Sequence, residues 1–182
     1  METITRFTFF LGLFLALSGH AAVSGVNVVD GSRIRIEESG EVPTVYVFLS
    51  ARCPCSKAHE GILRDLSREF SGQGVRFVGI HSNQNETPEE TQKHFQASGL
   101  PFPVIEDENA RIADEFRALK TPHVFVRKGS ISLFEGGVDD TSSGVAAKRH
   151  YLRDALREIS SGKNVTQARA RVLGCAIARS KS

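Results

Sequence analysis

The segment Thr44–Leu49, T-V-Y-V-F-L, is almost continuously apolar. A short run of this kind is typical of a strand buried on both faces of a central sheet, whereas a half-exposed strand alternates apolar and polar residues. A short polar link leads from this run to a C-P-C sequence at Cys53–Cys55, and Ala58–Phe70 then carries apolar residues at helical spacing. The segment therefore predicts an α/β domain in which two cysteines lie between a buried strand and a helix.

The position of Cys53 predicts a reactive thiol. It lies at or just before the start of the predicted helix, where unpaired backbone N–H groups and the helix macrodipole favour the thiolate. The thiolate is the nucleophilic form of cysteine, and the neighbouring Arg52 adds positive charge. Cys55 would lie inside the first turn, about 200° away around the helix axis if both residues were helical. A Cys53–Cys55 disulfide therefore requires Cys53 to stay outside the helix.

The N-terminal residues predict export. Phe7–Leu17 is apolar and is followed by small residues, with Gly19 and Ala21 at the −3 and −1 positions of a cut after Ala21. This pattern is typical of a secretory signal peptide over residues 1–21, and an uncleaved membrane anchor is the alternative. Either interpretation places the folded part outside the cytoplasm, so we expect a periplasmic or secreted protein that contacts the membrane only if the segment is uncleaved.

The three cysteines of the chain, Cys53, Cys55 and Cys175, all follow this segment. An odd number in an exported protein leaves one thiol unpaired or one pair that exchanges partners. Cys175 is therefore an alternative resolving cysteine for Cys53. Its apolar neighbours Leu173 and Ile177 are equally consistent with a buried structural role.

The rest of the chain has the element order of an α/β domain with an antiparallel sheet edge. The other predicted strands are Val26–Val29, Arg33–Ile36, Val75–Ile80, Phe102–Ile105, Pro122–Arg127 and Ile131–Glu135, and the other predicted helices are Pro88 to about Ala97, Asn109–Leu119 and Ala146–Ser160. We assign residues 22–160 to one domain and residues 161–182 to a C-terminal tail that carries Cys175. The net charge of +2 is small and no Lys/Arg run occurs, so nucleic-acid binding is not expected.

Several segments, in their order along the chain, resemble one protein family. They are Phe48–His59, Phe77–Glu86, Leu100–Asp107, Thr121–Val126, Gly136–Asp140, Tyr151–Leu156 and Gly174–Ile177. Together they resemble thioredoxin-like redoxins of the alkyl-hydroperoxide-reductase and thiol-specific-antioxidant group, in an exported subgroup with a C-P-C motif. The resemblance implies a thioredoxin-like three-layer α/β/α fold with a central mixed β-sheet. It also implies that Thr121-Pro122 is a cis peptide facing the active cysteine, with a trans proline at an edge strand as the alternative.

The C-P-C motif differs from the two active-site patterns of such proteins. Thioredoxins have C-x-x-C, but Ser56 occupies the position of the second cysteine here. Peroxiredoxins have P-x-x-x-T/S-x-x-C, but Tyr46 occupies the position of the proline. Neither pattern assigns the chemistry by itself, so the residues around the motif must be weighed individually.

The first interpretation is a thiol–disulfide oxidoreductase in which Cys53 attacks and Cys55 or Cys175 resolves the mixed disulfide. Substrate-binding residues are then expected at Ser50 and at the Thr121-Pro122 peptide. No organic cofactor or metal is required, because electrons pass by exchange with protein thiols and disulfides and with an electron-donor thiol protein.

Two other functions are compatible with the same residues. A thiol peroxidase would oxidise Cys53 to a sulfenic acid with small peroxides, with Ser50 near the peroxide and Arg117 or Arg127 stabilising the thiolate. A copper-binding assembly protein of thioredoxin fold would use two thiolates and a histidine, a donor set that suits Cu(I). His59, one turn beyond the C-P-C motif, is a candidate base or metal ligand, and a helix-surface histidine is its alternative.

Overall fold

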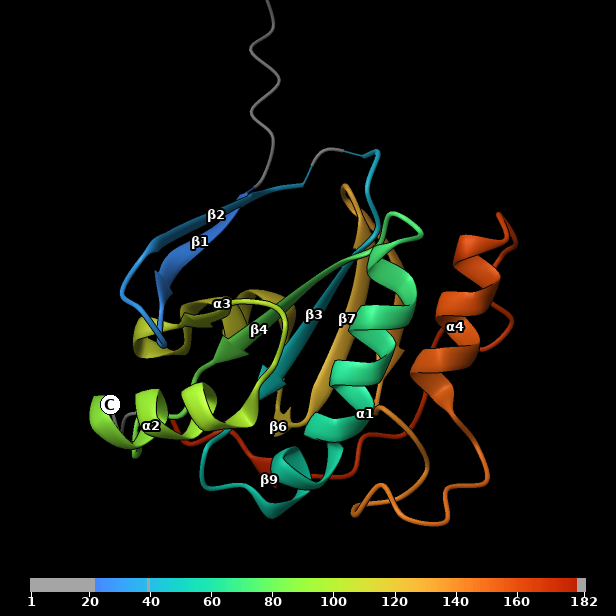
Figure 1. Ribbon diagram of the computed structural model, residues 1–182. Coiled ribbons are helices and arrows are strands. Elements are labelled where there is room, and N and C mark those ends of the chain that lie inside the picture. Colours follow the sequence, from blue (N-terminus) through green and yellow to red (C-terminus); the bar gives the residue numbers. More distant parts are fainter. Residues whose placement is uncertain (1–21, 39, 180–182) are drawn as a thin grey trace, which may run out of the picture.

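The computed structural model describes residues 22–38 and 40–179 (Figure 1). The predicted signal peptide over residues 1–21 lies outside the described residues. Within the described part of the chain, no helix is long and apolar enough to cross a bilayer.

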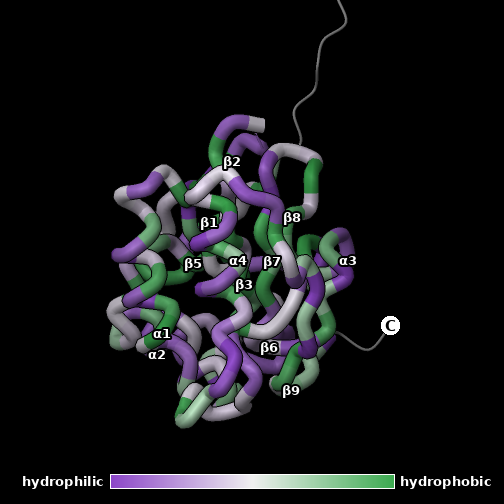
Figure 2. Tube along the Cα trace, turned by 90° about the vertical axis from the view of Figure 1, so that its right-hand side faces the viewer, coloured by the Kyte–Doolittle hydropathy of each residue, from purple (hydrophilic) through white to green (hydrophobic). Residues whose placement is uncertain are grey.

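A seven-stranded mixed sheet forms the centre of the molecule, in the order β2-β1-β5-β4-β3-β7-β8. Its strands are β1 (Ala22–Asn27), β2 (Arg33–Glu37), β3 (Thr44–Leu49), β4 (Arg76–His81), β5 (Val104–Glu106), β7 (His123–Lys128) and β8 (Ile131–Gly136). Strand β3 is parallel to β4 and antiparallel to β7, which makes the sheet mixed. All residues of β3 are buried, as its unbroken apolar sequence predicts. Figure 2 shows a similar apolar character in the middle of β7, over Val124–Val126.

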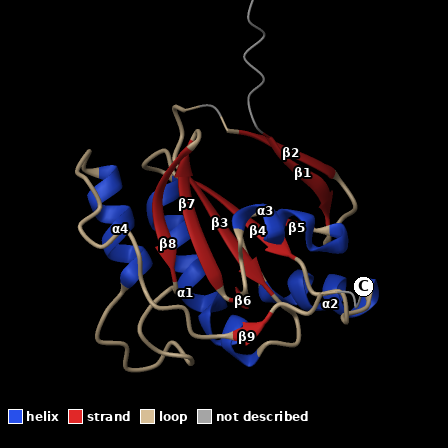
Figure 3. Ribbon diagram, turned by 180° about the vertical axis from the view of Figure 1, so that it is seen from behind, coloured by secondary structure: helices blue, strands red, loops and turns tan. Residues whose placement is uncertain are grey.

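Helices cover both faces of this sheet. Helices α1 (Pro54–Ser71), α2 (Pro88–Ser98) and α4 (Tyr151–Ser160) contribute to one apolar core with Val45, Val47 and Leu49 of β3. The 3₁₀ helix η1 (Glu108–Ala110) and helix α3 (Arg111–Phe116) contribute to a second core on the opposite face, with Tyr46 and Phe48 (Figure 3). The predicted three-layer α/β/α thioredoxin-like fold is therefore confirmed.

Two helices are shorter than their sequence pattern predicts. Helix α3 covers only the middle of the predicted Asn109–Leu119 helix, because Asn109, Ala110 and Arg117 all have positive φ values, between 55° and 58°. The side chain of Asp107 accepts hydrogen bonds from the free N–H groups at its start. Helix α4 begins at Tyr151 instead of Ala146, whose φ of 56° is incompatible with a right-handed helix.

The C-terminal segment after α4 lies against the domain. Short strand β9 (Cys175–Ala176) pairs antiparallel with β6 (Lys120–Thr121), immediately before Pro122. Figure 1 shows this segment, in red, passing below β6. The tail therefore brings Cys175 to the end of the sheet at which the C-P-C motif lies.

Candidate active site

Cys53 is the N-cap of α1 and has extended backbone angles, so it lies outside the helix. Its sulfur accepts a hydrogen bond from Ser56 N–H at 3.5 Å, and Pro54 occupies the first helical position. A cap sulfur at a helix N-terminus is favoured as an anion by the unpaired N–H groups and the macrodipole. The side chain is almost fully buried, with 3% of the residue exposed.

The Thr121-Pro122 peptide bond is cis, as the family resemblance implies. Its Thr121 carbonyl oxygen accepts a hydrogen bond from the Cys53 thiol at 3.0 Å. The predicted approach of this peptide to the cysteine therefore agrees with the geometry of the site.

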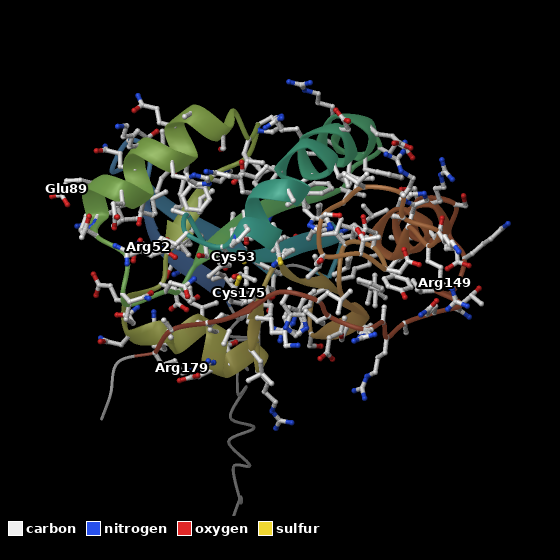
Figure 4. All side chains as sticks on the ribbon, turned by 90° about the horizontal axis from the view of Figure 1, so that it is seen from below. Arg52, Cys53, Glu89, Arg149, Cys175 and Arg179 are labelled. Carbon is white, nitrogen blue, oxygen red and sulfur yellow. The ribbon has the colours of Figure 1, made fainter. Side chains whose placement is uncertain are left out.

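Cys175 reaches the same place from the other end of the chain. It stands opposite Thr121 in the β6–β9 pair, and Figure 4 shows it beside Cys53. The sulfurs of Cys53, Cys55 and Cys175 all lie within 4.8 Å of one another, and all three cysteines are free thiols. Cys55 and Cys175 are half-buried, whereas Cys53 is buried.

The three sulfurs differ in acidity. Burial raises the pKa of Cys53, but hydrogen bonds, first of all from Cys175, outweigh it and leave that pKa below the usual value. Burial, the contact with Cys53 and the negative charge there raise the pKa of Cys175 to about 12. Burial and the charge of Cys53 also raise the pKa of Cys55. The cluster therefore favours one thiolate, at Cys53, stabilised by a neighbouring thiol.

A buried ionic network, which the sequence analysis missed, holds the turn before Cys53. The Ser50 hydroxyl accepts from Cys53 N–H at 3.0 Å and donates to a Glu86 carboxylate oxygen. Glu86 also accepts from Ala51 N–H at 2.8 Å and contacts His81 Nε2 at 3.1 Å. In the sequence, Glu86 ends the segment Phe77–Glu86, which resembles the family, but nothing in that segment indicates what Glu86 does.

The electrostatics of this network are set by His81, which lies between two carboxylates. Its Nδ1 contacts Glu106 at 2.8 Å, opposite the Nε2 contact with Glu86. Burial lowers the pKa of His81, but the hydrogen bonds and charges of Glu106 and Glu86 outweigh it and raise the pKa to about 9. Burial raises the pKa of Glu86, but His81 and Ser50 lower it below its usual value. An imidazolium and a carboxylate are therefore buried next to the turn that carries Cys53.

Two of the residues predicted for peroxide chemistry, Ser50 and Arg127, have other contacts. The Ser50 hydroxyl proton is directed to Glu86, as described above. Arg127 pairs with Thr44 at the amino end of β3 and stacks on Phe116, with 3.6 Å from the guanidinium carbon to the ring centroid. Cys53 follows the carboxyl end of β3, roughly 15 Å farther along the strand. Arg127 therefore does not stabilise the Cys53 thiolate.

His59 is not the helix-surface residue considered from the sequence. Its exposed fraction is 1%, its Nδ1 contacts the Cys55 carbonyl oxygen at 2.7 Å, and its Nε2 contacts Asp139 Oδ1 at 3.2 Å. Both ring nitrogens are engaged, so His59 is free neither as a base for the cysteines nor as a metal ligand. It connects the first turn of α1 to the segment after β8.

The fold and the cysteine cluster together define a thioredoxin-like protein with a candidate thiol-based active site. The AhpC/TSA family model matches residues 21–159, which is most of the chain. The chain belongs to the AhpC/TSA family and is a thiol-based oxidoreductase.

One relative and two solved structures resemble this chain over most of its length. The thiol-disulfide oxidoreductase ResA of Halalkalibacterium halodurans is 27% identical over 136 residues, which cover 72% of this chain and 76% of that protein. An uncharacterized conserved protein from Geobacillus kaustophilus has a TM-score of 0.80 and 27% identity, covering 90% of this chain and 91% of its own. A hypothetical protein from Sinorhizobium meliloti 1021 has a TM-score of 0.79 and 24% identity, covering 90% and 93%. This last likeness shows the fold alone.

Proposed function

We propose that the protein is an exported thiol–disulfide oxidoreductase, periplasmic or secreted, in which Cys53 attacks and Cys175 resolves. The observation that carries this proposal is the convergence of three free thiols within 4.8 Å, with the lowest pKa at Cys53. The signal-peptide pattern of residues 1–21 supports export.

The reaction is a two-step exchange. The Cys53 thiolate attacks a substrate disulfide RS–SR, so that a mixed disulfide forms between Cys53 and one RS group and the other group leaves as RS⁻. This RS⁻ takes up the proton of the Cys175 thiol. The Cys175 sulfur then attacks Cys53, which forms the Cys53–Cys175 disulfide and releases the second RS⁻. Two electrons pass from the protein to the substrate, and a donor thiol returns them in the next exchange.

Cys175 is the preferred resolving residue. Its contact with Cys53 lowers the pKa of that thiol more than any other, and β9 holds Cys175 opposite Thr121. Cys55 lies within reach of the same sulfur, so it is the alternative resolving residue.

A disulfide map of the mature protein tests this assignment. After reduction and exposure to glutathione disulfide, we expect a Cys53–Cys175 bridge and a free Cys55 thiol, read by differential alkylation and peptide mass spectrometry. In Cys175→Ser the bridge should move to Cys53–Cys55. A Cys53–Cys55 bridge in the wild type would make Cys55 the resolving residue, and three thiols that resist oxidation would overturn the redox function. The mass of the mature N-terminus reports whether residues 1–21 are removed.

Copper binding is a second candidate function, favoured by the same three sulfurs. Soft thiolate ligands select Cu(I), and the cluster supplies three of them without His59, whose nitrogens are occupied. The donor set that fits is therefore Cys53, Cys55 and Cys175, in place of the two thiolates and a histidine expected from the sequence.

A chelator competition titration of the reduced protein measures this binding. If copper delivery is the function, one Cu(I) should bind with sub-micromolar or tighter affinity, and Cys175→Ser should weaken the binding by roughly a hundredfold, equivalent to about 2.7 kcal/mol. Weaker binding, or binding that Cys175→Ser leaves unchanged, removes this function.

A further inference from the structure

The tail of this chain occupies the backbone edge beside Pro122. Lys120 pairs with Ala176 and Thr121 with Cys175 in antiparallel register. Beyond this pair, Ile177 N–H donates to the Leu119 carbonyl oxygen at 3.0 Å. The edge of β6 is therefore already satisfied by hydrogen bonds within the chain.

The pairing is anchored on both sides. After β9, Ala178 N–H donates to Asn83 Oδ1 and Gln84 N–H donates to the Ala178 carbonyl oxygen, each at 2.8 Å. Ile177, 5% exposed, is part of the core on the α3 face. Before β9, Ala170 N–H donates to the carbonyl oxygen of Glu135 in β8 at 2.9 Å. Release of β9 would break these contacts and expose Ile177, so the docked tail is strongly favoured.

Gly174 permits the close approach of the two segments. A Cβ atom at this position would lie 2.2 Å from the Thr121 carbonyl oxygen and 3.2 Å from Pro122 N. Its three nearest neighbours are all backbone atoms of Thr121 and Pro122, which cannot move aside as a side chain would. Any residue larger than glycine therefore displaces the tail from Thr121.

An occupied edge limits which substrates can bind. An extended polypeptide binds to a strand edge through main-chain hydrogen bonds, which requires that edge to be free. Here Thr121 and Pro122, the residues predicted to bind substrate, already contact the tail, and Cys175 holds the place that a polypeptide cysteine would take opposite Thr121. Cys55 and Cys175 are only half-buried, so part of each residue remains accessible to a small molecule.

We infer that the tail excludes extended polypeptides from the cysteine cluster, and that the site exchanges with low-molecular-weight thiols and disulfides. This inference rests on the proposed exchange function of Cys53. It narrows the substrate class from protein or small-molecule disulfides to small-molecule disulfides.

The test compares two disulfides with the pre-reduced full-length chain. One is glutathione disulfide, and the other is the symmetrical disulfide of a short extended peptide that contains the tail sequence G-C-A-I. The readout is the rate at which the Cys53 thiol is lost, followed by acid quenching, alkylation and mass spectrometry, so that only the first exchange step is measured. The wild type should react with glutathione disulfide faster than with the peptide disulfide by roughly tenfold or more.

Gly174→Ala should remove this selectivity. We expect the ratio of its peptide disulfide rate to its glutathione disulfide rate to rise roughly tenfold above the wild-type ratio. Displacement of Cys175 also changes the acidity of Cys53, which affects both rates alike, so the ratio of the two rates is the readout. Gly72→Ala is the matched control, because Gly72 has a right-handed φ of −65° and its added Cβ would meet no atom within 4 Å. It should behave as the wild type with both disulfides.

The outcomes separate the two proposals. If the wild type reacts equally fast with both disulfides, or if Gly174→Ala accelerates both equally, the exclusion of polypeptides is wrong and the exchange function stands. If neither disulfide consumes the Cys53 thiol, the exchange function itself fails. Hydrogen exchange gives a check that needs no variant, because rapid exchange of the Ile177 and Ala178 amides in the wild type would show that the edge is open and overturn the inference.

Discussion

Cys53→Ser should lower the rate of reaction with glutathione disulfide by about a thousandfold or more, which corresponds to at least about 4 kcal/mol in activation free energy. The expected loss is large because the attacking group is the Cys53 thiolate, and a serine hydroxyl does not form an equivalent anion near neutral pH. Cys55 and Cys175 replace it poorly, because burial raises the pKa of both thiols and neither lies at the N-cap of α1. The rate is measured from the glutathione released by the reduced protein.

The other two cysteines supply matched controls for this variant. Cys175→Ser should keep the first exchange step, so that a mixed disulfide on Cys53 appears first, as one added glutathione in the intact mass, before the Cys53–Cys55 bridge forms. Cys55→Ser should keep both steps if Cys175 resolves. Activity of Cys53→Ser close to that of the wild type would place the chemistry on another residue and reject the site.

The buried histidine His81 should dominate the loss of stability on the alkaline side of neutrality. Its pKa is raised from 6.5 in the unfolded chain to about 9 by Glu106 and Glu86, which outweigh the effect of burial. A raised pKa means that the stabilisation is fully present below pH 6.5 and is lost as the pH rises through 9. A shift of this size corresponds to about 3 kcal/mol in the free energy of unfolding.

His81→Gln tests this dependence, since it removes the charge that titrates. We expect its free energy of unfolding, measured by denaturant titration from pH 6 to pH 9.5, to vary less with pH than that of the wild type by an amount of order 3 kcal/mol. Its stability should also be lower at neutral pH, because Glu86 loses its buried cation. His150→Gln, at an exposed histidine, is the control for other titrating groups. Parallel curves for His81→Gln and the wild type would contradict the assigned ion network.

Local sequence patterns predicted the elements whose determinants are close in sequence. The apolar run of β3 predicted its burial on both faces, and α2 begins at Pro88 as predicted, with Thr87 as N-cap in a capping box with Glu90. Cys53 could be placed at the start of α1 for the same reason. The left-handed residues Asn109 and Ala110 carry no such signal, because neither glycine nor proline marks them. They account for the error at the start of α3.

The rest of the site depends on contacts between residues distant in sequence. Cys175 meets Thr121 through a two-residue strand, which is too short to give a periodic pattern. Glu86 is an ordinary polar loop residue in the sequence, and only the packing of β4 beside β3 brings it to Ser50 and Ala51. The burial of His59 likewise depends on Asp139, far along the chain. The sequence indicates the chemistry of the side chains at these positions, but it does not indicate which distant residues they contact.

The pairing of β9 with β6 also fixes the order in which the site can form during synthesis. Cys53 and Cys55 leave the ribosome together, whereas Cys175 follows only after every other strand and helix of the domain has been made. Until then, Cys53 has Cys55 as its only possible partner within the chain. The three-sulfur site is thus the last part of the molecule to be completed, and a chain arrested or cleaved before Gly174 would carry the nucleophile without the tail that covers it.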